Sequence, residues 1–460
     1  MWEPRLTGRK GPRYLAIVDA LTEDVASGDL KQGSRLPTHR DLAERLDLTV
    51  GTITRAYAEA ARRGLVSGEV GRGTFVRGAQ AGSEDEDGTI VDLGQNHPPE
   101  PAAQPPQAAL RSALQALTAR GNLGPLLDYP EAGGNTADRE AGAVWIAKAG
   151  VEATADRVLV CTGSQHGLTV VLATLLDPGD VLLAESLTYA GVKAAAGLLH
   201  LRLHGLAVDA DGLRPDAFEE ACGAGGAKAL YLIPTLHNPT TAVMPEARRL
   251  EIAEIARRHG VVLIEDDVHG LLPEERPLPL AVHVPELTCY LTSTSKTLAP
   301  GLRIAYLLAP AALVPRLTAS LRATTWAVAP LTAAVASAWI RDGTADALLA
   351  GRRREARERQ TLARRALAGA DFETRPEAYY LWLRLPEPWR SDSFASAVLA
   401  PGASVTSAET FAVGQAPVPH AVRLCLGAAR RRDTLQRGLS IVAEVLRGTG
   451  EAGAAVVQRW

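Results

Sequence analysis

Residues 292–306 read TSTSKTLAPGLRIAY and contain an isolated lysine. The chain has six lysines and 43 arginines, and Lys296 is the only lysine in its second half. A lysine amine can form a Schiff base with an aldehyde, which a guanidinium cannot because arginine stays protonated in proteins. Hydroxyls and an arginine that would suit a phosphate flank it in sequence: Ser293, Ser295 and Arg303. The pattern predicts a covalent site for a phosphorylated aldehyde, although a single lysine in a loop is more often solvated surface charge.

Other polar residues follow apolar, strand-like runs. Asp266 ends the run VLIEDD, where a buried carboxylate needs a positive partner such as a protonated pyridine nitrogen. Asn238, in IPTLHNPTT, lies in a Pro-flanked turn from which its amide could reach a ring oxygen. Ser164 and Gln165, in TGSQHGL, suit a phosphate at a helix N-terminus, and Tyr189, in ESLTYAG, could stack on an aromatic ring. Each signal is weak separately, but together they predict one aromatic, phosphorylated ligand at the mouth of a sheet.

The elements that must position these residues alternate between strand-like and helical stretches. Short runs rich in Val, Ile and Leu, separated by helical patterns, indicate a mostly parallel sheet flanked by helices. The fold class is therefore α/β. From about residue 345 an Arg-rich helix, GRRREARERQTLARRAL, opens a smaller second unit. The predicted strands lie within residues 157–163, 180–186, 228–234, 261–267, 289–295 and 379–385.

The first 78 residues form a separate module. An amphipathic helix begins near Tyr14, a second follows Thr38 in LPTHRDLAERL, and a third follows Thr49 in TVGTITRAYAEAARRG. GLVSGEVGRGTFVRG then predicts two short strands around a Gly-rich turn, a wing. The order of these stretches resembles the winged helix-turn-helix of GntR-type transcription regulators, although three helices alone would fit any small bundle.

That resemblance implies binding of double-stranded promoter DNA, with the third helix in the major groove. The residues that it places near bases or phosphates are Arg40, Thr49, Thr52, Arg55 and Arg72. Many relatives have Ser-Arg where this chain has Thr49 and Val50, so the resemblance leaves the operator sequence open. Residues 1–78 carry 13 Lys plus Arg against 10 Asp plus Glu. Because this excess is small, we expect tight binding to need two modules on two half-sites.

The body, over roughly residues 90–445, resembles the fold-type I pyridoxal-phosphate enzymes of the aminotransferase class. The motifs that carry the resemblance are TGSQHGL, ESLTYAG, PTLHNPTT, IEDDVHG, STSKTLAPGLR and AVRLCLG, in this order. It implies that Lys296 holds the cofactor aldehyde, Asp266 pairs with the pyridinium nitrogen, Asn238 bonds the ring hydroxyl and Tyr189 stacks on the ring. The phosphate would be held by Ser164, Gln165, Ser293, Ser295 and Arg303.

Three further residues enter through the same resemblance. Tyr129, in LLDYPEAGG, would reach the phosphate from the partner subunit, which implies a homodimer. Arg423 would bind a substrate or effector carboxylate, unless it is an ordinary strand arginine. His269 stands where many relatives have a tyrosine that bonds the ring hydroxyl, and its imidazole could donate the same bond or shift the protonation of the bound cofactor.

Composition and charge set the remaining expectations. The chain is 46% hydrophobic and 22% charged with a net charge of −3, which gives no global attraction to nucleic acid or an anionic membrane. The four cysteines follow no metal-ligand or CxxC spacing, and no apolar run reaches membrane-spanning length. We expect a cytoplasmic protein with reduced thiols, no metal site and no membrane partner. The expected domains are 1–78, a linker and lead-in segment at 79–106, a large domain at 107–344, a small C-terminal domain at 345–446 and a tail at 447–460.

A GntR-type module joined by an acidic linker to an aminotransferase-like body resembles the MocR-type regulators. The resemblance implies a regulator that senses pyridoxal phosphate, an amino-acid-like effector, or both. Two alternatives remain: a true aminotransferase with an appended DNA-binding module, and a regulator whose body has lost the cofactor and acts as a scaffold. Lys296, Asp266 and Asn238 together argue against the scaffold, and His269 argues mildly against the enzyme.

Overall fold

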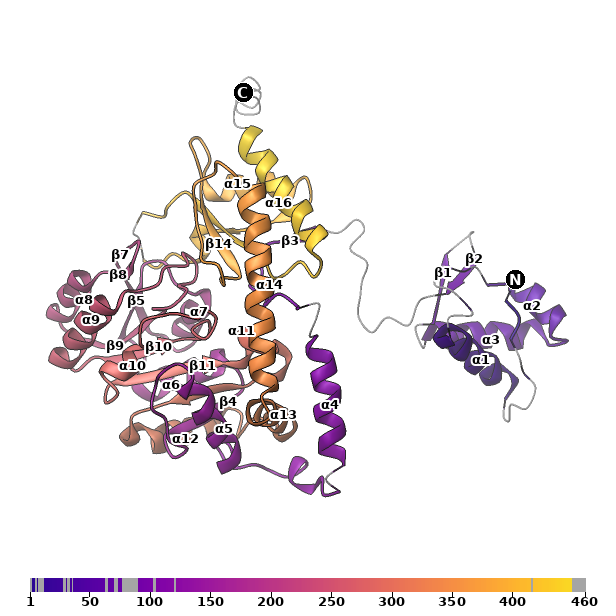
Figure 1. Cartoon of the computed structure of the whole chain (residues 1–460), viewed down its shortest axis with the longest axis horizontal. Coiled ribbons are helices and arrows are strands. Elements are labelled where there is room, and N and C mark those ends of the chain that lie inside the picture. Colours follow the sequence, from indigo (N-terminus) through magenta and orange to yellow (C-terminus); the bar gives the residue numbers. More distant parts are fainter. Residues whose placement is uncertain are drawn as a thin grey trace. The chain divides into compact units, whose positions relative to one another are not determined.

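The chain divides into two compact units, Met1–Asp87 and Gly88–Trp460 (Figure 1). The structure is a computed structural model, and it describes residues 2–4, 6, 12–27, 30, 34, 36–62, 65–69, 73–76, 90–101, 105–119, 121–414 and 417–448. Within these residues, no helix combines the length and the apolar character needed to cross a bilayer.

The described residues of the N-terminal unit form three helices and a two-stranded antiparallel sheet. Thr38 begins the second helix, where its hydroxyl accepts a hydrogen bond from the Asp41 amide at 3.2 Å. The hydroxyl of Thr49 accepts one from the Thr52 amide at 3.3 Å at the start of the third. The inward face of that helix is buried, so the predicted winged helix-turn-helix is confirmed. The elements are α1 (Arg13–Ser27), α2 (His39–Arg45), α3 (Val50–Arg62), β1 (Val66–Glu69) and β2 (Gly73–Val76).

A seven-stranded sheet in the order β4-β12-β11-β10-β9-β5-β6 forms the centre of the second unit. The strand β12 is antiparallel to both of its neighbours, β4 and β11, whereas all the other pairings in the sheet are parallel. Every residue of β11 is buried, as expected for a strand covered by helices on both faces. The strands are β4 (Val158–Cys161), β5 (Val181–Glu185), β6 (Arg202–Leu206), β9 (Ala227–Leu232), β10 (Val262–Asp266), β11 (Thr288–Ser293) and β12 (Ala305–Leu308).

Helices pack around this sheet, and α6, α7 and α11 begin shortly after the carboxyl ends of β4, β5 and β11. The helix α9 ends at Gly260, whose φ of 66° is the left-handed conformation that glycine adopts at little cost. A short pair, β7 (Val208–Asp209) and β8 (Gly212–Leu213), lies outside the sheet. The helices are α4 (Pro106–Thr118), α5 (Thr136–Ala147), α6 (Ser164–Leu175), α7 (Ala190–Leu198), α8 (Pro215–Gly223), α9 (Glu246–His259), α10 (Leu280–His283), α11 (Thr294–Thr297), α12 (Val314–Thr324) and α13 (Pro330–Arg341).

The smaller C-terminal part has an antiparallel sheet in the order β13-β14-β17-β16. The long helix α14 (Thr344–Ala366) runs between this part and the large sheet (Figure 1). A strand from the beginning of the unit, β3 (Val91–Asp92), pairs in parallel with β15 (Ala403–Ser404). The other elements are β13 (Phe372–Glu373), β14 (Tyr380–Arg384), β16 (Thr406–Ser407), β17 (Ala421–Cys425), α15 (Ser391–Leu399) and α16 (Arg432–Arg447).

The predicted α/β class is confirmed, and each of the six predicted strand runs overlaps a strand, with β9 and β11 beginning one residue earlier than predicted. β3 lies inside the range predicted as a linker and lead-in segment, so the ordered body begins earlier than residue 107. All four cysteines are reduced and buried: Cys161, Cys222, Cys289 and Cys425.

Candidate functional site

Lys296 lies in the short helix α11, directly after β11. The hydroxyl of Ser293 caps this helix by accepting a hydrogen bond from the Ser295 amide at 3.1 Å. Lys296 Nζ donates to the carbonyl of Asn96, and Tyr379 Oη donates to the Lys296 carbonyl at 2.8 Å. Burial lowers the pKa of the Lys296 amine to about 8. A substantial fraction of the amine is therefore neutral and nucleophilic near neutral pH.

Asp266 is the last residue of β10, and its side chain is only 4% exposed. Tyr231 Oη donates to its Oδ2 at 2.6 Å, and the Val268 amide donates to Oδ1 at 3.3 Å. Burial raises the pKa of Asp266 to about 6. Because both donors are neutral, the carboxylate still favours a cationic N–H such as a protonated pyridine nitrogen. Tyr189, at the start of α7, is near enough that burial and then the Asp266 charge raise the pKa of its phenol.

Arg423, on β17, joins the smaller part to the large sheet. Its Nη1 donates to Asn238 Oδ1 at 2.7 Å and its Nη2 to the Gly94 carbonyl at 2.7 Å. The guanidinium carbon lies 4.8 Å from the Phe411 ring centroid and 5.8 Å from that of Tyr380. Arg423 is 6% exposed, and its Nε has no acceptor among the described residues. These partners are uncharged, so the site holds a buried cation that a ligand carboxylate would neutralise.

His269 lies three residues after Asp266 and is 3% exposed. Its ring meets Tyr380 and Tyr379 edge-on, with centroids 5.6 and 6.5 Å away. Its Nε2 lies 3.2 Å from Asn96 Nδ2, whereas its Nδ1 has no partner among the described residues. Burial lowers the pKa of His269 well below its ordinary value, and nearby cations lower it further. His269 is therefore neutral at physiological pH, which favours the hydrogen-bonding role over the charged one.

The N-terminus of α6 and Arg303 together form a cradle for an anion. Gly163, whose φ is 81°, precedes Ser164, and the Arg303 guanidinium fills the space that a Cβ at Gly163 would need. The first amides of α6 have no partner within the helix and suit a phosphate oxygen. Gln165 is partly used elsewhere, because its Nε2 donates to the Gly191 carbonyl at 2.9 Å.

Ser293 and Ser295 are hydrogen-bonded to each other, and Tyr129 lies away from the lysine on the surface. The Ser293 hydroxyl lies 3.2 Å from the Ile304 carbonyl and 3.0 Å from the Ser295 hydroxyl, so it is occupied by contacts within the chain. Tyr129 lies on the surface, 85% exposed, with its ring edge-on to Trp326 at 6.0 Å. The contacts within one chain thus leave Tyr129 directed to solvent.

The predicted DNA-contacting residues lie on or beside α2 and α3. Arg40, Thr49 and Arg55 are exposed. The Thr49 and Thr52 hydroxyls are 2.9 Å apart, and the Arg55 guanidinium lies 4.3 Å from the Tyr14 ring centroid. Arg72 lies outside the described residues.

These residues fit pyridoxal phosphate. Buried polar atoms on three of the site's segments have no partner among the described residues: His269 Nδ1, Arg423 Nε and Gln165 Oε1. The charges of Asp266, Arg303 and Arg423 all shift the pKa of Lys296, so the amine, the carboxylate and the two guanidinium groups lie within electrostatic range of one another. The donor set thus matches a ring with a basic nitrogen, an oxygen substituent, an aldehyde and a phosphate.

Sequence reasoning missed several residues of the site. Asn96 lies in the Pro-rich stretch that the composition predicts to be a linker, and only its Asn-His polarity could have drawn attention to it. Tyr231 sits inside the apolar run KALYLIP, where a tyrosine is ordinarily core. Tyr379 and Tyr380 come from the smaller part, and their spacing from Lys296 carries no local signal.

Comparison with known proteins gives matches over nearly the whole chain. Residues 13–76 match the family described as bacterial regulatory proteins, gntR family, and residues 88–442 match aminotransferase class I and II. A Bacillus subtilis protein named "uncharacterized HTH-type transcriptional regulator YdeF" is 31% identical over 97% of this chain and 96% of its own length. The "probable rhizopine catabolism regulatory protein MocR" of Rhizobium meliloti is 25% identical over 65% of this chain and 66% of its own length.

Solved structures support the same fold for the body. The α-aminoadipate aminotransferase LysN of Thermus thermophilus superposes with a TM-score of 0.69 and 26% identity, covering 78% of this chain and 92% of LysN. A Pyrococcus horikoshii kynurenine aminotransferase superposes with a TM-score of 0.72 and 22% identity, covering 80% of this chain and 93% of that enzyme's chain. At this identity the likeness shows the fold alone. The chain therefore belongs to the MocR-type family, in which a GntR-type helix-turn-helix domain is fused to a class I and II aminotransferase domain.

Proposed function

We propose that this protein is a homodimeric transcription regulator that binds pyridoxal phosphate at Lys296 and adjusts its affinity for promoter DNA in response. The observation that carries the proposal is the buried cluster in which a lysine amine of lowered pKa interacts with the charges of Asp266, Arg303 and Arg423, while Arg423 is hydrogen-bonded to Asn238. The family supports it, because the relatives that match over most of this chain are named as transcriptional regulators. LysN, which shares the body's fold, is solved with a phosphopyridoxyl-leucine ligand.

In this proposal each side chain of the site around Lys296 has a separate role. Lys296 supplies the amine that holds the aldehyde, while Asp266 holds the proton on the ring nitrogen. Asn238 and His269 would orient the ring oxygen, and Tyr189 would cover the ring face. The phosphate would be held by Ser164, Gln165, Ser295 and Arg303, with Ser293 positioning Ser295 through the hydrogen bond between their hydroxyls. When bound, the cofactor supplies an electrophilic carbon at which amino compounds react. Arg423 would select effectors that carry a carboxylate.

The N-terminal unit supplies the DNA contacts. In this proposal α3 enters the major groove, so the exposed side chains Thr49 and Arg55 face the duplex, with Thr52 beside them. Arg40, at the start of α2, and Arg72, in the wing, would contact phosphates. A dimer would place two such units on two half-sites and multiply a weak individual affinity.

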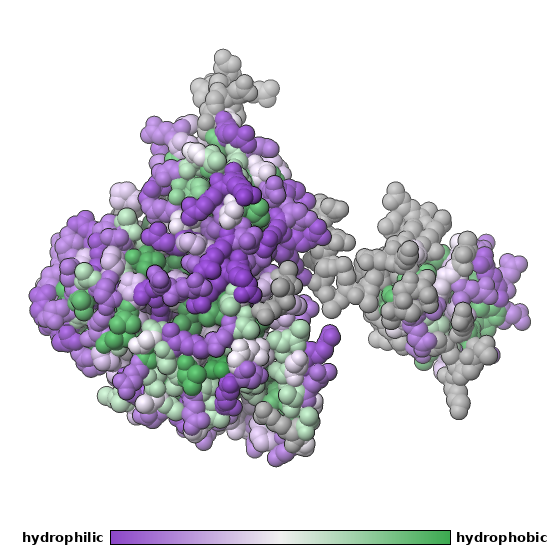
Figure 2. Space-filling view, in the orientation of Figure 1, coloured by the Kyte–Doolittle hydropathy of each residue, from purple (hydrophilic) through white to green (hydrophobic). Residues whose placement is uncertain are grey.

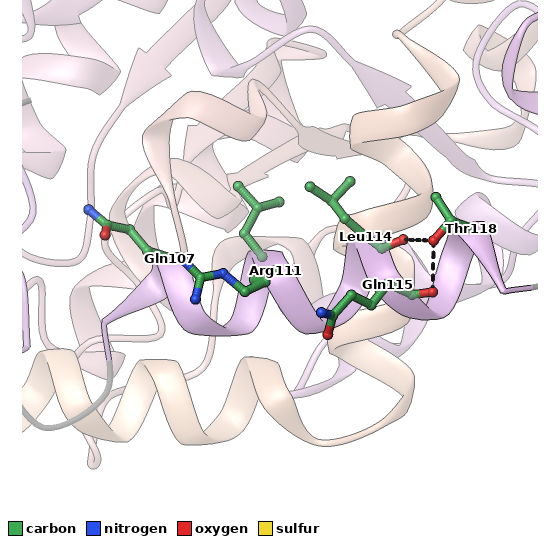
Figure 3. A pocket seen from close by; sticks show the side chains of 6 residues that line it. Gln107, Arg111, Leu114, Gln115 and Thr118 are labelled. Atoms are coloured by element: carbon green, nitrogen blue, oxygen red, sulfur yellow. Dashed lines mark hydrogen bonds between the residues drawn. The ribbon is translucent and has the colours of Figure 1, made fainter. Parts of the chain in front are cut away.

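The second unit offers a surface that suits a second copy of this chain. A groove along the outer face of α4 is lined by Leu110 and Leu114 among polar residues, and Figure 3 shows Leu114 and its neighbours along this helix. A second depression shares Leu114 and continues to Leu127, which is 87% exposed, and a third continues to Tyr129. Figure 2 shows hydrophobic residues reaching the surface around α4, while the face over α14 is mostly hydrophilic. Burial of this apolar surface would favour a dimer and would place Tyr129 near the partner's site.

Attachment of the cofactor can be tested by borohydride reduction in the presence of pyridoxal phosphate, followed by mass spectrometry of peptides. We expect a pyridoxyl adduct on Lys296. The adduct should be absent from a Lys296→Arg variant and retained in the control Lys228→Arg, whose lysine is exposed and paired with Asp180 at 2.6 Å. Failure to modify Lys296 would refute cofactor binding.

Regulation requires a second experiment, footprinting on the gene's own upstream region with and without pyridoxal phosphate. A protected site whose occupancy changes with the cofactor is expected. If protection never exceeds that of random DNA at moderate salt, the regulatory proposal is wrong even when Lys296 is modified.

A second candidate function, an active aminotransferase, is favoured by the presence of both the lysine and a buried arginine for a carboxylate. A panel of amino donors with a keto acid acceptor distinguishes the two. Turnover at ordinary enzyme rates, about 1 per second or more, would favour the enzyme, and much slower turnover with ligand-dependent DNA binding would favour the regulator.

A further inference from the structure

Three of the residues proposed to bind the cofactor or effector are hydrogen-bonded to one short segment, residues 94–99, here called the strap. Arg423 Nη2 donates to the Gly94 carbonyl at 2.7 Å. Lys296 Nζ donates to the Asn96 carbonyl, and Asn96 Nδ2 lies 3.2 Å from His269 Nε2. The strap therefore uses the same amine and guanidinium that a ligand would need.

The strap is anchored at its N-terminal end in the smaller part. It directly follows β3, which pairs with β15, and Val91 and Leu93 are buried in the same core as α16. Thr406 Oγ1 also donates to the Gly94 carbonyl, at 2.9 Å. Movement of the strap's first residues is thus coupled to the packing of the smaller part.

Arg352, on α14, anchors the other end. It is 3% exposed, its Nη1 donates to the Pro99 carbonyl, and its Nε and Nη2 donate to the Leu298 carbonyl at 3.1 and 2.6 Å. Leu298 lies two residues after Lys296. One buried guanidinium therefore ties the strap to the loop that carries the lysine, and its planar, multi-donor geometry is one that a lysine does not reproduce.

Attachment of an aldehyde would leave the Lys296 nitrogen at most one N–H, held in a fixed plane, in place of three freely rotating ammonium donors, so attachment competes with the hydrogen bond to the Asn96 carbonyl. A ligand carboxylate at Arg423 competes in the same way with the Gly94 carbonyl. Only residues 77–93 separate the strap from β2, the last described element of the DNA-binding unit.

We propose that the strap is the relay of this regulator: occupation of Lys296 releases residues 94–97, and Arg352 is the positioning residue that makes this release depend on the lysine loop. The inference rests on the proposed function, since it needs a cofactor at Lys296 and a DNA-binding unit that responds. It adds the segment and the residue through which the response passes.

Hydrogen exchange on the full-length, unmodified protein tests the release without any variant. Adding pyridoxal phosphate is expected to speed exchange of the amides of residues 94–97, while the peptide of β14, residues 380–384, serves as an internal comparison. If Lys296 is modified and strap exchange stays unchanged or slows, the relay is wrong although the proposed function stands. If Lys296 takes up no pyridoxal phosphate, both fall.

The anchor is tested by Arg352→Lys with Arg353→Lys as the matched control. Arg353 also donates to backbone carbonyls, those of Leu272 at 3.0 Å and Leu271 at 2.7 Å, but not to the strap. For each protein the Kd for its upstream duplex is measured without and with pyridoxal phosphate. The two Kd values, without and with pyridoxal phosphate, should differ by a factor of about five or more in the unmodified protein and in Arg353→Lys. In Arg352→Lys the two Kd values should be nearly equal, while cofactor uptake should be the same in all three proteins. An undiminished ratio in Arg352→Lys would overturn its role, and so would an equal loss in both variants. Should Arg352→Lys not fold, the exchange measurement decides.

Discussion

The lowered pKa of Lys296 predicts the pH dependence of cofactor attachment. Only the neutral amine attacks an aldehyde. With a pKa of about 8, about one-tenth of the amine is neutral at pH 7, whereas an ordinary lysine with a pKa of 10.5 would have about three parts in ten thousand. The structure therefore predicts a reactive fraction about 300 times that of a surface lysine at pH 7.

The assay is stopped-flow absorbance of cofactor attachment to the ligand-free protein from pH 6 to 10. The rate should rise about tenfold from pH 6 to 7 and level off above about pH 9, because about nine-tenths of Lys296 is then deprotonated. A rate that keeps rising tenfold per pH unit through pH 9 and 10 would refute the reasoning, since it would show an unshifted amine.

Substitutions of the charged neighbours of Lys296 should move its pKa in opposite directions. The Arg423 charge lowers the pKa of Lys296 and the Asp266 charge raises it, after the main effect of burial. Arg423→Gln should therefore move the plateau to higher pH, and Asp266→Asn should move it to lower pH. Arg384→Gln is the control, because Arg384 is exposed and paired with Asp371 and Glu373, and its profile should match that of the unmodified protein.

Three further predictions concern assembly, stability and DNA binding. Leu127→Asp should convert the proposed dimer to monomer in light scattering, because it puts a charge into the apolar surface at Leu127, a side chain that is 87% exposed in one chain; an unchanged mass would remove α4 and its surroundings from the interface. Arg249→Met should lower the free energy of unfolding, measured in urea, by about 3–5 kcal/mol. Arg249 is fully buried, donates hydrogen bonds to the carbonyls of Met244 and Pro234, and lies 3.9 Å from the Glu265 carboxylate. A loss under about 1 kcal/mol would contradict this. Arg55→Ala should weaken DNA binding and reduce the salt slope by about one for each phosphate that is no longer neutralised, as measured by anisotropy, and an unchanged affinity would exclude Arg55 from the interface.

The parts of the site that local sequence could predict are those at strand ends. Asp266, Asn238, Tyr189 and Lys296 each follow a short apolar run, and the carboxyl ends of neighbouring parallel strands must meet at one edge of the sheet. Their convergence follows from the α/β pattern and needs no knowledge of the packing of the smaller part. The capping residue Thr38 was predictable in the same way, because its hydrogen bond spans only three residues.

The residues that sequence could not predict depend on contacts between distant segments. Arg352, Arg353 and Arg354 are consecutive and alike as letters, yet Arg352 is 3% exposed and reaches both the strap and the lysine loop. Arg352 turns inward because it lies on the buried face of α14, four residues from both Leu348 and Ala356. Its partners, the Pro99 and Leu298 carbonyls, come from segments that the sequence of α14 does not indicate. Asn96 was hidden for a related reason: the stretch QNHPPEP is polar and Pro-rich like a linker, and only pairing of β3 with β15 holds it against the lysine.

The burial of all four thiols makes the protein convenient for fluorescence work. Burial raises the pKa of Cys161 and Cys289 to about 12 and that of Cys222 to about 11, and it also raises the pKa of Cys425. A maleimide dye, which reacts with thiolate, should therefore leave the native chain unlabelled and attach only at a cysteine introduced on purpose. A dye pair with one member on each unit would then follow the distance between them in solution as ligand is titrated.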